Sequence, residues 1–244
     1  MMTLPYFDAI RAVLTEAEQK NAETIAKLGV TIAESIAAGG ILHLFGTGHG
    51  HMLAEELFYR AGGLVPVNAI LDPTLMLHES ALASSLAERL PGYAEVVLSR
   101  YRVEPGETLI IASNSGRNSV PIEMAIAAKA RGLTVVALTS LAHANAHPSR
   151  HKSGKHLHEL ADFVLDNCGV VGDAALTVEG VAEPIAPTST VVGVALLHSV
   201  VYAVTTQLVQ NHVEPPIFIS ANVGDADEHN ERLLERYRGR LRHL

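Results

Sequence analysis

The chain has 244 residues, of which 48% are hydrophobic and 5% aromatic, and its formal net charge at pH 7 is −8. This length indicates one large domain or one domain with extensions, and the negative charge argues against nonspecific nucleic-acid binding. The single cysteine, Cys168, excludes an intrachain disulfide and a cysteine-rich metal site.

The first predicted element is helical and spans residues 6–38, as two helices or one bent helix. Apolar residues recur there at helical spacing until Gly39 and Gly40. The first 24 residues carry four acidic side chains, so they resemble neither a signal peptide nor a transit peptide. No apolar stretch of about 18 residues is free of polar breaks, so we expect no membrane span. These features fit a cytoplasmic protein.

Strand and helix patterns then alternate along the chain. We expect strands at residues 41–45, 64–71, 108–112, 133–138 and 163–165, with a further strand at 173–178 at an edge of the sheet. Helices are expected at residues 52–60, 120–129, about 188–211 and 228–241, and a long connection with short helical pieces at 72–93. Long connections of this kind are usually functional or disordered. The order predicts a parallel sheet with helices on both faces, whose ligands bind beyond the carboxyl ends of the strands.

The turn Ser-Asn-Ser-Gly-Arg-Asn at residues 113–118 is the most informative of the segments at such an end. It stands between a buried strand and a helix, so it places hydroxyls and free N–H groups at the positive end of that helix. Glycine there lets the backbone approach a ligand. The turn therefore predicts a phosphate cradle, built from Ser113, Asn114, Ser115, Gly116 and Asn118. An ordinary polar loop is the alternative.

A second turn, Gly-Thr-Gly-His-Gly at residues 46–50, could be mistaken for a dinucleotide-binding fingerprint. His51 stands where the third glycine of that fingerprint would be, and no acidic residue ends the second strand. A small-residue turn that approaches a sugar or a phosphate is the better interpretation. We expect Gly48, His49 and His51 to contact the substrate.

Glu55 and Glu56 lie on a helix whose other residues are mostly apolar. Adjacent helical positions point about 100° apart, so one glutamate can face the site while the other faces elsewhere. A buried carboxylate needs a partner or its pKa rises, and a pKa near neutrality suits a general base. The alternative is a solvated helix face.

Histidines and basic residues supply further candidates. The His49-x-His51 spacing is plausible for zinc, but a third ligand would be needed, which His78 or its neighbour Glu79 could supply. Histidines in a pocket more often serve as hydrogen-bond donors or as acids and bases. His198 lies on an apolar helix face, where a satisfied core histidine is the alternative to a functional one.

Two polar segments late in the chain are candidate anion contacts. Residues 149–155 contain Arg150, Lys152 and Lys155, and the alternative is a solvated basic loop. Ser189 and Thr190 place hydroxyls at the start of the last long helix, where ordinary capping is the alternative.

Together, these motifs resemble the SIS (sugar isomerase) domain: the Gly-Thr-Gly turn at 46–48, the Ala-Glu-Glu-Leu helix at 54–57, the Ser-x-Ser-Gly loop at 113–116 and the hydroxyl-capped long helix. The resemblance covers about residues 36–211. It implies an α/β fold, a three-layer α/β/α sandwich with a five-stranded parallel sheet, in a single domain over residues 1–244 with helical extensions at both ends. It also implies a small phosphosugar ligand and a homodimer or homotetramer with the site near the subunit interface.

The chain departs from the usual family pattern at two positions. The family's phosphate loop usually ends in Thr where this chain has Asn118, and its first turn often has Ser where this chain has Gly50. Each departure keeps a backbone donor and removes a hydroxyl, which puts direct side-chain contacts from these two positions in doubt.

Within the family, Ala-Glu-Glu-Leu is similar to the helix of sedoheptulose-7-phosphate isomerases, which implies a catalytic acid/base at Glu56 and a role for His198. A fuller pattern resembles a bacterial subgroup of the family, one member of which is an N-acetylglucosamine-6-phosphate dehydratase. This pattern comprises residues 48–63, Leu-Met-Leu-His at 75–78 and Ser-Arg-His-Lys-Ser-Gly at 149–154. The resemblance thus implies elimination from an N-acetylated hexosamine 6-phosphate.

The expected reaction begins at the open-chain sugar, whose aldehyde makes the C2 proton acidic. Glu56, or failing that Glu55, removes this proton, and His78 or His198 is the candidate acid. Protonation of the C3 oxygen gives elimination, whereas protonation of C1 gives isomerisation. One base and one acid suffice, so neither a metal nor a redox cofactor is expected. The alternatives are an aldose–ketose isomerase and a phosphosugar sensor, although no basic helix-turn-helix pattern supplies an output domain.

Overall fold

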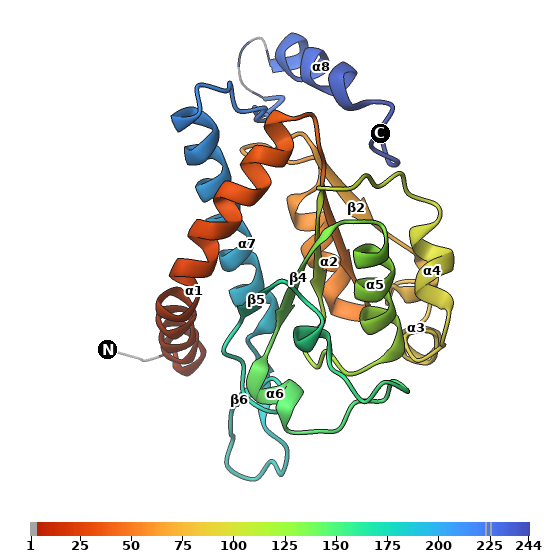
Figure 1. Cartoon of the computed structure of the whole chain (residues 1–244). Helices are drawn as coiled ribbons and strands as arrows, with labels where there is room; N and C mark the ends of the chain where they lie inside the picture. The colour runs from red at the N-terminus through yellow and green to blue at the C-terminus, as the bar shows by residue number, and fades with distance from the viewer. Residues whose placement is uncertain (1–3, 223, 225) are drawn as a thin grey trace.

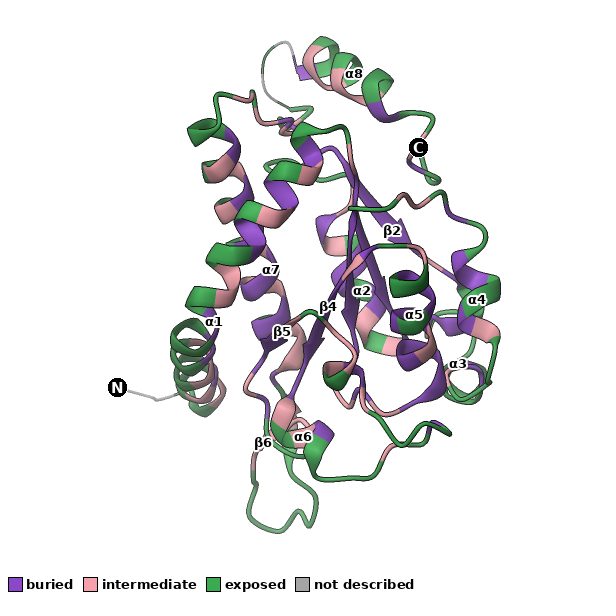
Figure 2. Cartoon of the chain, viewed as in Figure 1, coloured by how far each residue is buried: buried purple, intermediate pink, exposed green. Residues whose placement is uncertain are grey.

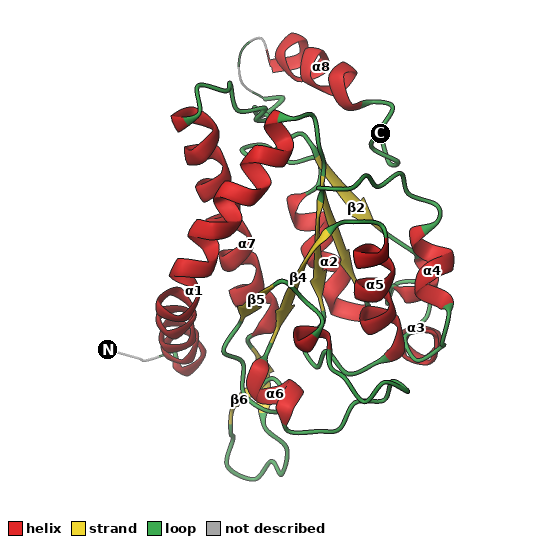
Figure 3. Cartoon of the chain, in the orientation of Figure 1, coloured by secondary structure: helices red, strands yellow, loops and turns green. Residues whose placement is uncertain are grey.

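The computed structural model describes residues 4–222, 224 and 226–244, which form a three-layer sandwich around a parallel sheet (Figures 1 and 3). The sheet has five strands, in the spatial order β2-β1-β3-β4-β5, and each neighbouring pair is parallel. The predicted fold class is therefore confirmed. The strands are β1 (Leu42–Gly46), β2 (Val67–Ile70), β3 (Thr108–Ala112), β4 (Thr134–Thr139) and β5 (Phe163–Asp166).

The sheet is buried on both faces because its strands are almost continuously apolar (Figure 2). Successive side chains of a strand point to opposite faces. In β3, Ile110 joins the core on one side of the sheet, while Leu109 and Ile111 join the core on the other side. Two separate apolar layers therefore hold the helices in place.

Three helices pack on the first of these faces: α1 (Pro5–Ala37), α2 (His51–Leu57) and α7 (Ser189–Gln210). The predicted N-terminal helical region is one continuous helix. A Cβ atom at Gly29 of α1 would lie 2.8 Å from the Cβ of Ala203 on α7, so the close contact of these helices needs glycine. By length and composition α7 could cross a membrane, but its buried residues pack in the core against α1 and α2.

The other face of the sheet is covered by α4 (Tyr93–Leu98) and α5 (Ser119–Ala130), with α3 (Ala81–Ala87) beside them. The long connection between β2 and β3 carries α3, α4 and a 3-10 turn, η2 (Pro73–Leu75), as the short helical pieces that the sequence predicts.

The predicted edge strand at residues 173–178 is wrong in its placement. A strand does form there, β6 (Ala174–Leu176), but it pairs antiparallel with β7 (Ile185–Pro187) in a separate two-stranded sheet. Gly172 and Asp173 both have positive φ, +85° and +59°, so the chain turns sharply before β6. This turn directs β6 to its hairpin partner instead of to the edge of the main sheet.

The remaining helices and turns lie near the ends of the sheet. They are η1 (Gly48–Gly50), α6 (Leu141–Asn145), η3 (Leu157–Glu159) and α8 (Ala226–Tyr237). The helix predicted at 52–60 ends earlier, because Phe58 is extended and Tyr59 has a φ of +48°. The helix predicted at 228–241 likewise ends at Tyr237, which packs with Phe218 and Leu241 in a small third cluster.

Candidate functional site

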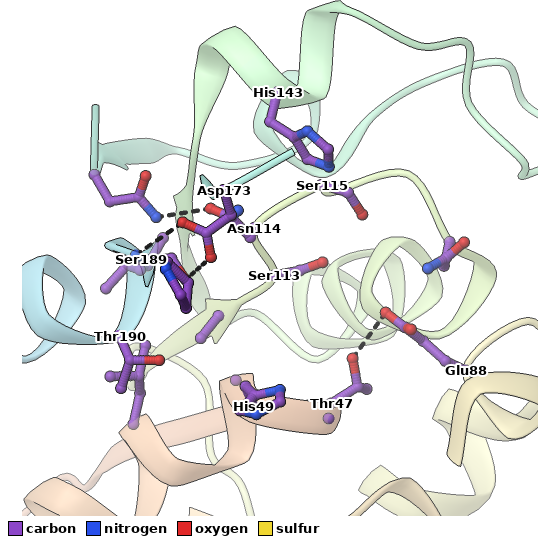
Figure 4. Close-up of a pocket in the computed structure, with 18 of the residues that line it drawn as sticks. Thr47, His49, Glu88, Ser113, Asn114, Ser115, His143, Asp173, Ser189 and Thr190 are labelled. Atoms are coloured by element: carbon purple, nitrogen blue, oxygen red, sulfur yellow. Dashed lines mark hydrogen bonds between the residues drawn. The ribbon is translucent and has the colours of Figure 1, made fainter. Parts of the chain in front are cut away.

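A cavity of about 450 Å³ lies at the carboxyl ends of β1, β3 and β4, as expected for a sheet of this kind (Figure 4). Its walls come from the turn after β1, the loop after β3, the region of α3, α6 and the start of α7. Eight predicted contact residues line it: Gly48, His49, Ser113, Asn114, Ser115, Asn118, Ser189 and Thr190. Polar residues that we did not predict also line it, among them Thr47, Glu88, His143, Asn167 and Asp173.

The loop at residues 113–118 forms a tight bend with an available hydroxyl proton. Ser113 Oγ accepts a hydrogen bond from Gly116 N at 3.2 Å, so its own proton remains free to donate to a ligand. Gly116 has a φ of +55°, and a Cβ atom there would lie 3.3 Å from Leu157 Cβ. The bend therefore favours glycine and keeps both serines of the loop close to the cavity.

Asn118 is the N-cap residue of α5, but its side chain makes no capping hydrogen bond. Its Oδ1 accepts instead from Arg150 Nη1 at 3.0 Å, which leaves the Asn118 amide hydrogens free to donate. The start of α5 therefore combines the positive helix end with side-chain donors at the cavity wall, an arrangement that suits an anion.

Asn114 connects the loop to the ends of β4 and β5. Its Oδ1 accepts from Asn167 Nδ2 at 2.9 Å, and its carbonyl oxygen accepts from Thr139 Oγ1 and Ser140 N, both at 3.1 Å. These bonds fix the loop on the rigid sheet, so that its donors are positioned before any ligand arrives.

Glu88 is a carboxylate in the cavity wall with spare hydrogen-bonding capacity. Glu88 is the C-cap residue of α3 and is half-buried. Its Oε1 accepts a hydrogen bond from Thr47 Oγ1 at 2.8 Å (Figure 4). Within the described chain, its other oxygen makes no hydrogen bond. Motif reasoning missed Glu88 because Thr47 is 41 positions away. The available signal is the long connection at residues 72–93, a kind of segment that is usually functional or disordered.

Asp173 is the second carboxylate of the cavity wall, and it is already engaged. Its Oδ1 accepts from Thr188 N at 3.1 Å and Ser189 N at 3.0 Å, and its Oδ2 accepts from Ser189 Oγ. The prediction that hydroxyls at 188–190 cap α7 is wrong, because Thr188 is the N-cap residue and makes no side-chain cap bond. Asp173 supplies this cap from outside the helix, and it orients Ser189 at the cavity wall.

His143, on α6, faces the cavity as a neutral imidazole. Its Nδ1 accepts a hydrogen bond from Gly172 N at 2.9 Å, so the ring proton lies on Nε2. Burial lowers the pKa of His143, and the nearby His147 and Arg117 lower it further against the opposing charge of Asp173. The Nε2–H group is therefore a hydrogen-bond donor that stays uncharged at neutral pH.

A comparison of the sequence with known protein families agrees with this arrangement of the cavity. Residues 5–140 match the SIS domain family. The chain belongs to that family. The match begins at residue 5 and so includes α1, whereas the resemblance seen in the sequence begins only at about residue 36.

Relatives of this SIS-domain chain are similar over nearly their whole length. A UPF0309 protein from Geobacillus thermodenitrificans is 46% identical over 236 residues, which cover 97% of this chain and 95% of the relative. A UPF0309 protein from Halalkalibacterium halodurans is 46% identical over 240 residues, with coverages of 98% and 96%.

Solved structures support the SIS fold. A phosphoheptose isomerase from Francisella tularensis superposes with a TM-score of 0.55 at 15% identity, covering 84% of this chain and 100% of that one. A phosphoheptose isomerase from Neisseria gonorrhoeae gives a TM-score of 0.55 at 18% identity, covering 83% and 96%. At these identities the likeness is one of fold.

Within this SIS domain, the four predicted catalytic residues do not line the cavity. Glu56 Oε1 accepts a hydrogen bond from His198 Nε2 at 3.0 Å and pairs with Arg60. His198 lines a separate hollow on the outer surface of α1 and α7. Glu55 is half-exposed, with its Oε2 3.6 Å from His51 Nε2, and His78 is exposed. Their catalytic roles stay predictions.

The other predicted contacts do not line the cavity. His51 is buried and bonds to the carbonyl of Gly48, and its ring centroid lies 6.3 Å from that of His78. Gly116 is buried, and Arg150 donates a hydrogen bond to Asn118. Lys152, two residues after Arg150, is exposed. Over the described residues, no group of three or more His, Cys, Asp and Glu side chains is placed to hold a metal ion.

Proposed function

We propose that this SIS-domain chain is a cytoplasmic phosphosugar enzyme that dehydrates N-acetylglucosamine 6-phosphate. The observation that carries the proposal is that one cavity holds both the anion-binding loop at 113–118 and Glu88, a carboxylate with a free oxygen. Its volume of about 450 Å³ is in the range of small-molecule sites. The subgroup resemblance of residues 48–63 and 149–154 favours the N-acetylated substrate.

The phosphate is assigned to the loop between β3 and α5. The hydroxyls of Ser113 and Ser115, the amide of Asn118 and the N-terminus of α5 supply donors and partial positive charge at one point. With the phosphate there, the sugar extends across the cavity toward His49 and Ser189, which line its other walls (Figure 4).

Glu88 is the base in this proposal. The C1 aldehyde of the open-chain sugar acidifies the C2 proton, and the free oxygen of Glu88 removes it. The protonated Glu88 then returns this proton to the C3 oxygen. The electron pair left at C2 forms the C2–C3 double bond as the C3–O bond breaks with its own pair on oxygen, and water leaves. His143 donates a hydrogen bond from Nε2 to a sugar oxygen that gains negative charge. An acetamido group at C2 disfavours the ketose, because C2 carries nitrogen instead of a hydroxyl.

A second candidate function is aldose–ketose isomerisation with Glu56 as the acid/base. The hydrogen bond between Glu56 and His198 favours it, since the resemblance to sedoheptulose-7-phosphate isomerases assigns roles to both residues. In that case the proton returns to C1 and no water is lost.

Two parallel incubations separate these reactions. Purified protein is mixed in deuterated water at neutral pH with N-acetylglucosamine 6-phosphate or with an unacetylated hexose 6-phosphate. Dehydration gives a new ultraviolet absorbance and a product lighter by one water. Isomerisation of an unacetylated hexose 6-phosphate instead gives deuterium at C1 or C2 with no loss of water. An unchanged N-acetylglucosamine 6-phosphate across the neutral pH range overturns the proposed dehydration.

Matched variants locate the base and separate an enzyme from a sensor. Glu88→Gln should lower turnover by about 10²–10⁴-fold and keep phosphosugar affinity, while Glu56→Gln should keep turnover. The reverse pattern assigns the base to Glu56. Wild-type protein that binds the phosphosugar and never turns it over identifies a sensor. Replacing Ser113 and Ser115 with alanine should weaken the binding of every hexose phosphate.

We also propose that the chain forms a homo-oligomer through α1 and α7. Tyr202 is 76% exposed and Val209 59% exposed, which is unusual for apolar side chains on a core helix. Tyr202 borders the outer hollow that also contains His198. Sedimentation analysis should show a dimer or tetramer that Tyr202→Glu weakens, and a monomeric wild type contradicts this proposal.

A further inference from the structure

Three arginines gather beside the end of the cavity formed by Glu88 and Asn118. Arg150 binds Asn118 through its side chain at 3.0 Å, and its backbone N–H donates to the carbonyl oxygen of Arg117 at 2.8 Å. Arg89 follows Glu88, whose carbonyl oxygen accepts from the first turn of α5 at 3.0 Å. Three separate segments therefore bring Arg89, Arg117 and Arg150 together; we call them the arginine cluster.

The arginine cluster lacks the carboxylate partners that several other arginines have. Arg60, Arg131 and Arg240 each form an ion pair with a glutamate. Across the described residues, no carboxylate lies within ion-pair distance of the cluster's guanidinium groups, although the carboxylate of Glu88 lies nearby. The Nε of Arg117 is buried and has no hydrogen-bond partner there. An unsatisfied buried donor is costly, so the described residues alone do not satisfy the Arg117 guanidinium group.

The electrostatics of the cluster lead to the same conclusion. Burial lowers the pKa of Arg150, and the positive charges of Arg117 and Arg89 lower it further, against the opposing charge of Glu88. Like charges that repel in the free protein are stabilised when an anion lies between them. The chain as a whole carries a net charge of −8, so the charge of the arginine cluster is opposite in sign to that of the whole protein.

We propose that the arginine cluster binds a second anionic group, a carboxylate or a phosphate, so that the protein binds a hexose 6-phosphate carrying such a group more tightly than a singly anionic one. This inference rests on the proposed function, because it assigns the first phosphate to the loop at 113–118. That loop already supplies serine, amide and helix N-terminal donors for one phosphate. The guanidinium groups beyond Asn118 match the planar, bidentate recognition of carboxylates and phosphates.

Calorimetric titration of the full chain tests the inference with three probes: glucose 6-phosphate, glucose 1,6-bisphosphate and 6-phosphogluconate. We expect at least one of the two doubly anionic probes to bind about tenfold more tightly than glucose 6-phosphate. A preference for the bisphosphate identifies a second phosphate as the natural group, and a preference for 6-phosphogluconate identifies a carboxylate.

Variants show whether this preference comes from the cluster. Arg89→Ala and Arg150→Ala should each bring the affinity ratio between doubly and singly anionic probes close to one, and Arg150→Lys should restore it in part. Arg102→Ala is the control, because Arg102 pairs with Glu104 at 2.8 Å and lies outside the cluster. Equal weakening of all three probes, or no preference in the wild type, overturns the inference. If the wild type binds none of the probes and also fails to bind N-acetylglucosamine 6-phosphate, the proposed function itself fails.

Discussion

Two polar clusters lie at opposite ends of the same sheet, and each is centred on a glutamate. At the amino ends of the strands, Glu107 accepts hydrogen bonds on both oxygens: Oε1 from Ile41 N at 2.9 Å and from Arg240, and Oε2 from Glu104 N at 2.7 Å and His43 Nε2 at 2.9 Å. At the carboxyl ends, Glu88 accepts from Thr47 alone among the described residues.

The difference is that one glutamate has its hydrogen-bonding capacity filled within the protein, whereas the other keeps an oxygen available to a ligand. Burial raises the pKa of Glu107, but hydrogen bonds from His43 and the backbone of Glu104, the charge of His43 and a hydrogen bond from Arg240 outweigh it and lower the pKa overall. A carboxylate with all its partners inside the protein stabilises the fold. Glu88 keeps an unused oxygen at the cavity wall, where a ligand can donate a hydrogen bond to it.

Replacing the cavity glutamate should give the largest effect. Glu88→Gln removes the proposed base, so kcat should fall by about 10²–10⁴-fold. The free energy of unfolding should change by less than about 0.5 kcal/mol, because the residue is not part of the apolar core. Steady-state kinetics and urea unfolding measure the two effects. A variant that loses stability instead of activity would remove the contrast between the two glutamates.

Replacing the buried glutamate should have the opposite outcome. Glu107→Ala leaves His43, Arg240 and two backbone N–H groups without their acceptor, and the free energy of unfolding should fall by about 3–5 kcal/mol. Phosphosugar affinity of the folded fraction should stay the same. Glu235→Ala is the control, since it breaks an exposed pair with Arg238 and should change stability little. Urea unfolding of both variants provides the comparison.

Replacing Asp173 should affect both stability and activity, since Asp173 both caps α7 and orients Ser189. Asp173→Ala should destabilise the protein by about 0.5–2 kcal/mol through the lost cap. It should also raise KM for the phosphosugar more than it lowers kcat, because the Ser189 hydroxyl loses the partner that orients it. Thermal unfolding and kinetics on one preparation test both parts. An unchanged KM would show that Ser189 does not contact substrate.

The pH dependence of stability should show a smaller effect of Glu107. Its pKa in the folded protein lies below the ordinary value of 4.5, so its contribution is complete above about pH 4.5. This contribution is lost as the pH falls from there through the lowered folded-state value. Urea unfolding between pH 6 and pH 3 should therefore show a steeper loss of stability for the wild type than for Glu107→Ala. Parallel curves contradict this assignment.

The sequence predicts the sheet and the location of the site because both depend on local patterns. Apolar strands alternate with helices, and the turns at 46–50 and 113–118 carry small and hydroxyl residues wherever the chain leaves the sheet. Glu88 and His143 are brought to the same cavity by tertiary packing, through contacts with Thr47 and Gly172 that no local spacing reveals. The sequence predicts that nearby hydroxyls cap α7, because Asp173 lies 16 positions before Ser189 and no sequence pattern connects the two residues.

The bond between Arg240 and Glu107 has a consequence for synthesis of the chain. Glu107 accepts a hydrogen bond from Ile41 N just before β1, but its positively charged partner, Arg240, lies 133 positions further along the chain. During translation the earlier residues can collapse into the sandwich, while the buried glutamate lacks this counter-charge until residue 240 has emerged from the ribosome. A nascent chain stalled before that point should hold a less stable sheet than the released protein, even though all five strands are already present.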